Sequence, residues 1–74
     1  MINRRIIKKK RKELGMSQTD LALAIGYTDK SIISRIENGK VRDIPLTKAV
    51  LLSRVLKIEI QELVKGGYRV PENT

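Results

Sequence analysis

The stretch that decides the fold runs from Ser17 to Lys40 and reads SQTDLALAIGYTDKSIISRIENGK. Its apolar residues recur at the spacing of two short amphipathic helices, and Gly26 separates the two. The second predicted helix carries polar side chains along the side that faces away from its apolar residues. Two short helices joined by such a turn are typical of the helix-turn-helix motif, which places one helix in the major groove of DNA.

Capping residues define the first of the two helices. Ser17 followed three residues later by Asp20 is the pattern of a capping box, in which the serine hydroxyl accepts a hydrogen bond from the first helical turn. The acidic side chain also complements the positive N-terminal end of the helix. We therefore predict a helix over residues 18–25, ended by Gly26 in the usual position after a helix.

The second helix is bounded in the same way. Either Thr28 or Asp29 can offer a side-chain oxygen as its N-cap, and the apolar spacing ends near Glu37. Asn38 and Gly39 follow, as is typical after a helix C-terminus. This second helix is the one expected to carry the recognition surface.

Three further helices are predicted from the flanking sequence, over residues 4–14, 46–56 and 60–64. Asn3 is placed to cap the first of them, and Pro45 suits the first turn of the second. The connections between all five segments are short, as in helical bundles. The predicted fold class is therefore all-α, one compact unit of five helices.

One domain is expected over residues 1–67, followed by a short C-terminal tail over residues 68–74. A chain of 74 residues buries only about 60% of its unfolded surface, so a second copy would add stability. The helix predicted over residues 46–56 has an apolar arc wider than one buried face needs. We therefore expect a homodimer built on this arc, on the short helix predicted over residues 60–64 and on the run Tyr68-Arg69-Val70, with a tail that becomes ordered on dimerisation.

The chain is strongly basic. Sixteen Lys and Arg residues against eight Asp and Glu residues give a net charge of +8, and seven of the cations lie between Arg4 and Lys12. A polyanion is the expected partner. A basic helix carrying Ile2, Ile6 and Ile7 could also lie on an anionic membrane. That interpretation is weaker, because aromatic anchors are lacking and these isoleucines are needed for the core.

Several classes of function are disfavoured by the residue inventory. The sequence has no cysteine and no histidine, which removes thiolate and imidazole metal sites and the commonest general base. We find no glycine-rich phosphate loop and no inward-facing carboxylate pair. An enzyme is therefore not expected, nor is a cofactor, a metal or a small-molecule ligand.

Tyr27 and Tyr68 are the only aromatic residues, so duplex DNA is favoured over single strands. With no segment long enough to span a membrane, a cytoplasmic protein is expected.

A set of specific residues adds to the spacing argument: Gln18, Leu21, Ala22, Ile25 and Gly26, then Ile33, Ile36 and the run Glu37-Asn38-Gly39-Lys40. Through them the chain resembles, over Arg4 to Lys65, the Cro and lambda-repressor-like helix-turn-helix family, including regulators of the xenobiotic-response-element type. The resemblance implies a lambda-repressor-like domain whose second and third helices form the motif. The turn over residues 26–31 is one residue longer than the commonest family version.

Four side chains near the start and middle of the recognition helix are candidates for reading base edges: Lys30, Ser31, Ser34 and Arg35. Lys30 and Arg35 carry most of the expected discrimination, because Lys and Arg can bond O6 and N7 of guanine. Ordinary phosphate contacts are an equally good interpretation of both. Ile32 could touch a thymine methyl group.

Five further residues are candidate phosphate ligands: Gln18, Thr28, Asn38, Lys40 and Arg42. The resemblance implies that Gln18 clamps a phosphate at the start of its helix, and that the loop containing Lys40 and Arg42 follows the DNA backbone. A solvated surface role for Gln18 and a helix-capping role for Asn38 are the alternatives. The resemblance also suggests a structural ion pair between Arg11 and Glu37.

The leading hypothesis is a transcriptional regulator that binds duplex DNA at a specific sequence. We expect it to be a repressor that acts as a homodimer. The recognition helices of the two subunits would enter successive major grooves about 34 Å apart on an inverted-repeat operator. The alternative is an antitoxin or another protein-interaction module in which DNA binding is secondary.

Overall fold

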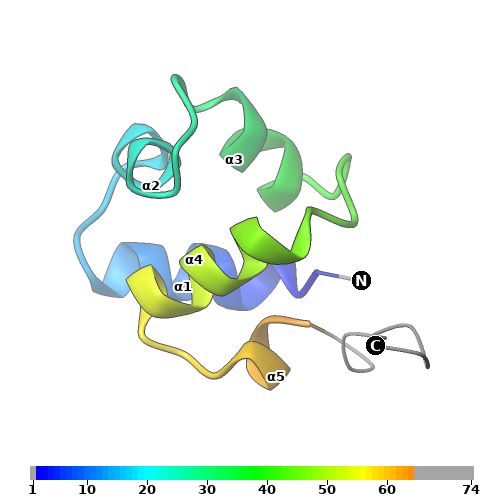
Figure 1. Ribbon diagram of the computed structural model, residues 1–74. Helices are drawn as coiled ribbons and strands as arrows, with labels where there is room; N and C mark the ends of the chain where they lie inside the picture. Colours follow the sequence, from blue (N-terminus) through cyan, green and yellow to red (C-terminus); the bar gives the residue numbers. More distant parts are fainter. Residues whose placement is uncertain (1, 65–74) are drawn as a thin grey trace.

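The computed structural model describes residues 2–64, and Figure 1 shows how its helices are arranged. The helices are α1 (Arg4–Glu13), α2 (Gln18–Ala24), α3 (Ser31–Glu37), α4 (Leu46–Leu56) and α5 (Ile60–Leu63). All five predicted helices are therefore confirmed, and so is the all-α fold class. The expected domain boundary after residue 67 and the tail at Tyr68–Val70 lie outside the described residues.

Local capping explains where the first two helices begin and end. The side chain of Asn3 accepts a hydrogen bond from the amide of Ile6, and both hydrogen bonds of the capping box between Ser17 and Asp20 are present. α1 and α2 are each one residue shorter than predicted, because Leu14 and Ile25 take the C-cap positions. The glycine after each helix has a positive φ, a backbone conformation that side chains with a Cβ rarely adopt.

The predicted cap of α3 needs a correction. Lys30, with helical backbone angles and no capping hydrogen bond from its side chain, takes the N-cap position instead of Thr28 or Asp29. Asp29 still serves the helix start, because its Oδ1 accepts a hydrogen bond of 2.8 Å from the amide of Ser31. Such a bond to the second residue along the chain closes a local turn that competes with a conventional cap.

The ends of α4 and α5 differ slightly from prediction. Pro45 lies at the N-cap of α4 with φ of −55° rather than inside the first turn. Its ring fixes φ near this value, which suits the residue that leads into a helix. Val64 is the C-cap of α5 and forms an antiparallel bridge with Ile2.

The helices share one core. α3 packs against α1 and α2, while α5 packs against α1 and α4. The fully buried large side chains come from every helix: Ile7, Leu21, Ile25, Ile33, Ile36, Leu52, Leu56 and Leu63. Ala22 is also fully buried, in agreement with the need for a small residue where the two helices of the motif meet. One side of α3 thus packs against α1 and α2, and its opposite side faces solvent (Figure 1).

The wide apolar arc of α4 is only partly covered. Ala49, Leu52 and Leu56 are buried, whereas Leu46 is 44% exposed and Leu51 is 36% exposed. The described part of the chain thus leaves two large apolar side chains of this helix in solvent. They are candidates for the part of the predicted dimer surface that α4 contributes.

Candidate nucleic-acid interface

The exposed side of α3 carries three of the four predicted base-reading residues. Lys30, Ser31 and Arg35 are exposed, while Ile33 and Ile36 are fully buried on the other side of the helix. Ser31 and Arg35 are four residues apart, so their side chains lie on the same face. The structure therefore brings a lysine, an arginine and a hydroxyl together at one accessible surface.

Two other residues of α3 are half-buried. Ser34 is half-buried, and its Oγ accepts a hydrogen bond of 3.4 Å from Nδ2 of Asn38. Ile32 is half-buried and packs against the core. Asn38 is the C-cap of α3, in keeping with the capping alternative, although its side chain bonds Ser34 rather than a backbone carbonyl.

A network around Glu37 joins three segments beneath this surface. Nε of Arg11 donates to Oε2 of Glu37 at 2.8 Å, and Nη2 donates to Oε1 at 3.1 Å. Nη1 of Arg11 also donates to the carbonyl oxygen of Met16 at 2.8 Å. Arg11 is only 8% exposed, so the pair is largely removed from water. The expected ion pair thus has bidentate geometry, the strongest arrangement for these groups.

Gln18 belongs to the same network. Its Nε2 donates a hydrogen bond of 3.1 Å to Oε1 of Glu37, and the residue is half-buried. The alternative of a freely solvated Gln18 therefore does not hold. This bond fixes the orientation of the side chain at the first turn of α2, where the carboxylate of Asp20 is already engaged by Ser17.

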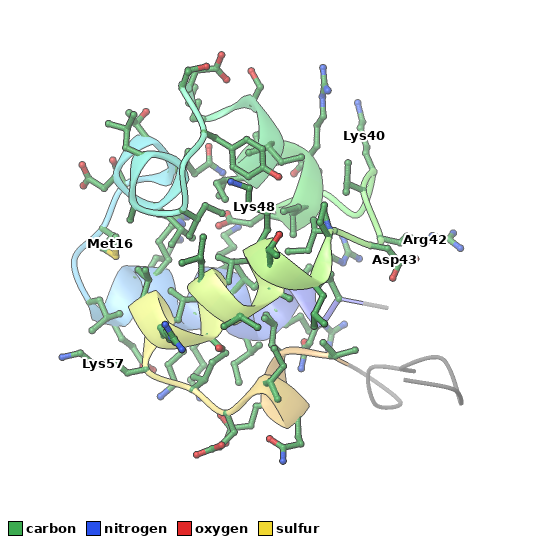
Figure 2. The ribbon with its side chains drawn as sticks, viewed as in Figure 1. Met16, Lys40, Arg42, Asp43, Lys48 and Lys57 are labelled. Atoms are coloured by element: carbon green, nitrogen blue, oxygen red, sulfur yellow. The ribbon has the colours of Figure 1, made fainter. Side chains whose placement is uncertain are left out.

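The other predicted phosphate ligands are all exposed. Thr28 lies in the turn between α2 and α3, and Lys40 and Arg42 lie in the loop between α3 and α4. In Figure 2 Lys40 extends beside α3, whereas Arg42 points outward farther along the loop. The candidates therefore flank the exposed side of α3 at both of its ends.

Two aspartates, at the starts of α2 and α3, have lowered pKa values. Hydrogen bonds from the backbone amide and hydroxyl of Ser17 lower the pKa of Asp20 below its ordinary value of 3.8. Hydrogen bonds from the hydroxyl and amide of Ser31, with a smaller effect of Arg35, lower the pKa of Asp29. Both carboxylates are therefore charged at neutral pH and fixed to a helix start.

The sequence did not predict the role of Lys48. This residue of α4 stabilises the turn before α3, although the two are far apart in the sequence. Its Nζ donates a hydrogen bond of 2.9 Å to the carbonyl oxygen of Ile25 and lies 4.8 Å from the centroid of the Tyr27 ring. Figure 2 shows the ammonium group of Lys48 directed from α4 towards this turn. No local pattern connects positions 23 residues apart, so the spacing of apolar and polar residues carried no signal for this bond.

The described residues offer neither a metal site nor a membrane span. Among residues 2–64, no group of three or more His, Cys, Asp or Glu residues is placed to hold a metal ion. Over the same residues, no helix combines the length and the apolar character that crossing a membrane requires.

The geometry agrees with a match to a known family. The helix-turn-helix family HTH_3 matches residues 7–63. The chain belongs to this family. It is also 43% identical over 72 residues to the ImmF control region 10 kDa protein of Bacillus phage phi105, a match that covers 85% of this chain and 77% of that protein.

Two solved structures have the same fold as this member of the family. A chain of the SinR protein/SinI protein complex matches with a TM-score of 0.74 at 33% identity, over 89% of this chain but only 62% of that chain. The crystal structure of SinR, the master regulator for biofilm formation, in complex with DNA matches with a TM-score of 0.69 at 35% identity, over 81% of this chain and 92% of that one. These matches confirm a lambda-repressor-like fold and place the chain among DNA-binding transcriptional regulators.

Proposed function

We propose that this regulator is a sequence-specific repressor that binds an inverted-repeat operator in duplex DNA, with α3 of each subunit of a homodimer in the major groove. The exposed side of α3, which presents Lys30, Ser31 and Arg35, is the observation that carries the proposal. Lysine and arginine can recognise guanine in the major groove, and they are the principal candidates for base recognition here. Because the target is genomic DNA, the proposal includes a cytoplasmic location.

Phosphate contacts fix the register of α3 in this proposal. Gln18 approaches the DNA backbone at one end of the motif, with Thr28 in the turn, and Asn38, Lys40 and Arg42 do so at the other. The bond from Gln18 to Glu37 supports a clamp whose amide is held before DNA arrives. Ordering this side chain in advance reduces the entropy lost on binding.

The homodimer is supported by exposed apolar surface. Leu46 and Leu51 on α4 are large and accessible, and a second copy would remove them from water. An isologous pair of subunits would then match the two-fold symmetry of an inverted repeat. Repression would follow from occupancy of the operator and would depend on protein concentration through the dimer equilibrium.

Selection from randomised duplexes tests the function. We expect an inverted repeat whose half-sites are centred about one helical turn, roughly 10 base pairs, apart. Repeating the selection with Arg35→Ala should remove the preference at one position of each half-site, whereas Lys57→Ala, on the exposed end of α4, should leave the motif unchanged. Sedimentation of the protein with and without the selected duplex measures whether it forms the proposed homodimer.

Two other outcomes would reject the proposal. Weak, salt-sensitive association with no preferred sequence would favour a protein-interaction module such as an antitoxin, in which DNA binding is secondary. No complex with any duplex at low ionic strength would remove the DNA-binding role altogether.

A further inference from the structure

A hollow of about 440 Å³ opens between the first turn of α1 and the loop that follows α3. Three guanidinium side chains line it, those of Arg4, Arg5 and Arg42, and within residues 2–64 the lining includes no acidic side chain. Ile36 and Val41 contribute apolar surface to the same hollow. We call it the arginine hollow.

Tertiary contacts hold the two walls of the arginine hollow together. The amide of Ile2 donates a hydrogen bond of 2.7 Å to the carbonyl oxygen of Arg42, which joins the start of the chain to the loop. The guanidinium of Arg4 lies against Gly39, so closely that a Cβ at this position would be 2.9 Å from Nη1. Arg4 is thus placed beside Gly39 and Arg42 of the loop, although more than 30 residues separate them in the chain.

The first turn of α1 does not stabilise the charges of its two arginines. Arg4 and Arg5 occupy the first turn of the helix, which contains no acidic residue. Cations at this end are unfavourable, because the helix dipole makes it positive. Arg42 adds a third cation to the same small volume, and the side chains of all three residues are exposed. Such a concentration of like charge favours an anionic ligand.

The chemistry of the lining selects among anions. Pockets for small organic ligands are mostly apolar with few polar groups. Here, in the part of the chain that the structure describes, the polar side chains of the lining are three guanidinium groups. Guanidinium groups bind phosphate oxygens in a bidentate manner. The arginine hollow is also continuous with the loop that the proposed function assigns to the DNA backbone, since Gly39, Val41 and Arg42 belong to both.

We propose that the arginine hollow binds a backbone phosphate of duplex DNA, so that Arg4 and Arg5 extend the contact surface beyond the helix-turn-helix motif. The inference rests on the proposed function and adds two residues of α1 to its contact surface. It also separates these two from the other cations between Arg4 and Lys12. Among those, Lys10 pairs with Glu13, Arg11 pairs with Glu37, and the rest are left to solvent.

The test compares two charge-matched double variants of the full chain. In one, Arg4→Gln is combined with Arg5→Gln; in the other, Lys9→Gln is combined with Lys12→Gln, two exposed residues farther along the same helix. Affinity for the selected duplex and for an unrelated duplex is measured over a range of salt concentrations. We expect the arginine variant to have a shallower slope of log K against log salt on both duplexes, by about 0.9 for each phosphate that a subunit no longer neutralises. The lysine variant should keep the wild-type slope.

Thermal unfolding separates a binding role from a structural one. Removing two cations from the positive end of α1 should leave the melting temperature of the arginine variant unchanged or raise it, while its affinity falls. The single variant Arg5→Gln, which leaves the contact between Arg4 and Gly39 intact, should show part of the same change in slope. Equal slopes for the two double variants would overturn the proposal that the arginine hollow binds a phosphate, and so would a weaker affinity accompanied by a matching decrease in stability. Neither result would affect the proposed regulator function. Failure of the wild-type protein to bind any duplex would overturn both.

Discussion

The ammonium group of Lys48 bonds the carbonyl oxygen of Ile25 at 2.9 Å and thereby connects the first turn of α4 to the C-terminal end of α2. The carbonyl groups at a helix C-terminus have no partner within the helix, and the helix dipole makes this end negative. A cation there satisfies both conditions. The same ammonium group lies near the Tyr27 ring, so one side chain fixes the turn that leads into α3.

Lys48→Met should lower the free energy of unfolding by about 1–2 kcal/mol, because a charged hydrogen bond at a helix C-terminus is removed while the aliphatic part of the side chain is kept. Urea denaturation gives the value. Lys57→Met is the matched control, since Lys57 is exposed at the other end of α4 and extends away from the turn (Figure 2). Equal losses in the two variants would mean that the bond to Ile25 contributes nothing beyond general charge.

Arg11→Met should be much more costly, by about 3–5 kcal/mol, because it leaves the carboxylate of Glu37 buried without its charged partner. A variant that combines Arg11→Met with Glu37→Met should lose clearly less than the sum of the two single losses. The difference, obtained from a double-mutant cycle in urea, measures the coupling between the two groups. Additive losses would show that the two side chains act independently.

Alanine variants of the recognition surface should distinguish residues that read bases from residues that contact phosphates. Lys30→Ala and Arg35→Ala should each cost about 1–3 kcal/mol on the best duplex and relax the preference at one base, whereas Lys40→Ala should weaken binding to all sequences alike. Titrations with the selected and an unrelated duplex supply the comparison. Losses of equal size on both duplexes would assign Lys30 and Arg35 to phosphates.

The capping box of α2 should make stability depend on pH in the acidic range. The pKa of Asp20 is lowered in the folded protein, so its contribution is fully present above the ordinary value of 3.8 and is lost as the pH falls through the lowered pKa. Asp20→Asn should therefore melt at a lower temperature than the wild type at neutral pH. The two melting curves should converge in strong acid, and a gap that persists there would exclude the charge as its cause.

Local signals predicted much of the motif. The capping box, the glycines after α1, α2 and α3, and the apolar spacing located all five helices to within a few residues, because each of these features acts between close neighbours in the chain. The exposed positions of Lys30 and Arg35 followed from the same periodicity. The start of α3 was missed, since Asp29 bonds the second residue along the chain instead of capping the helix.

What the sequence by itself determined is which segments become helices and which faces of them are apolar, because propensity, capping and periodicity are local properties. Only the tertiary structure decided that Lys48 reaches Ile25, that Arg4 lies against Gly39, and that Ile2 pairs with Val64. These contacts join residues 23 or more positions apart, and packing of the shared core brings them together. The surface offered to DNA is therefore built from local helices and from cations whose places the fold assigns.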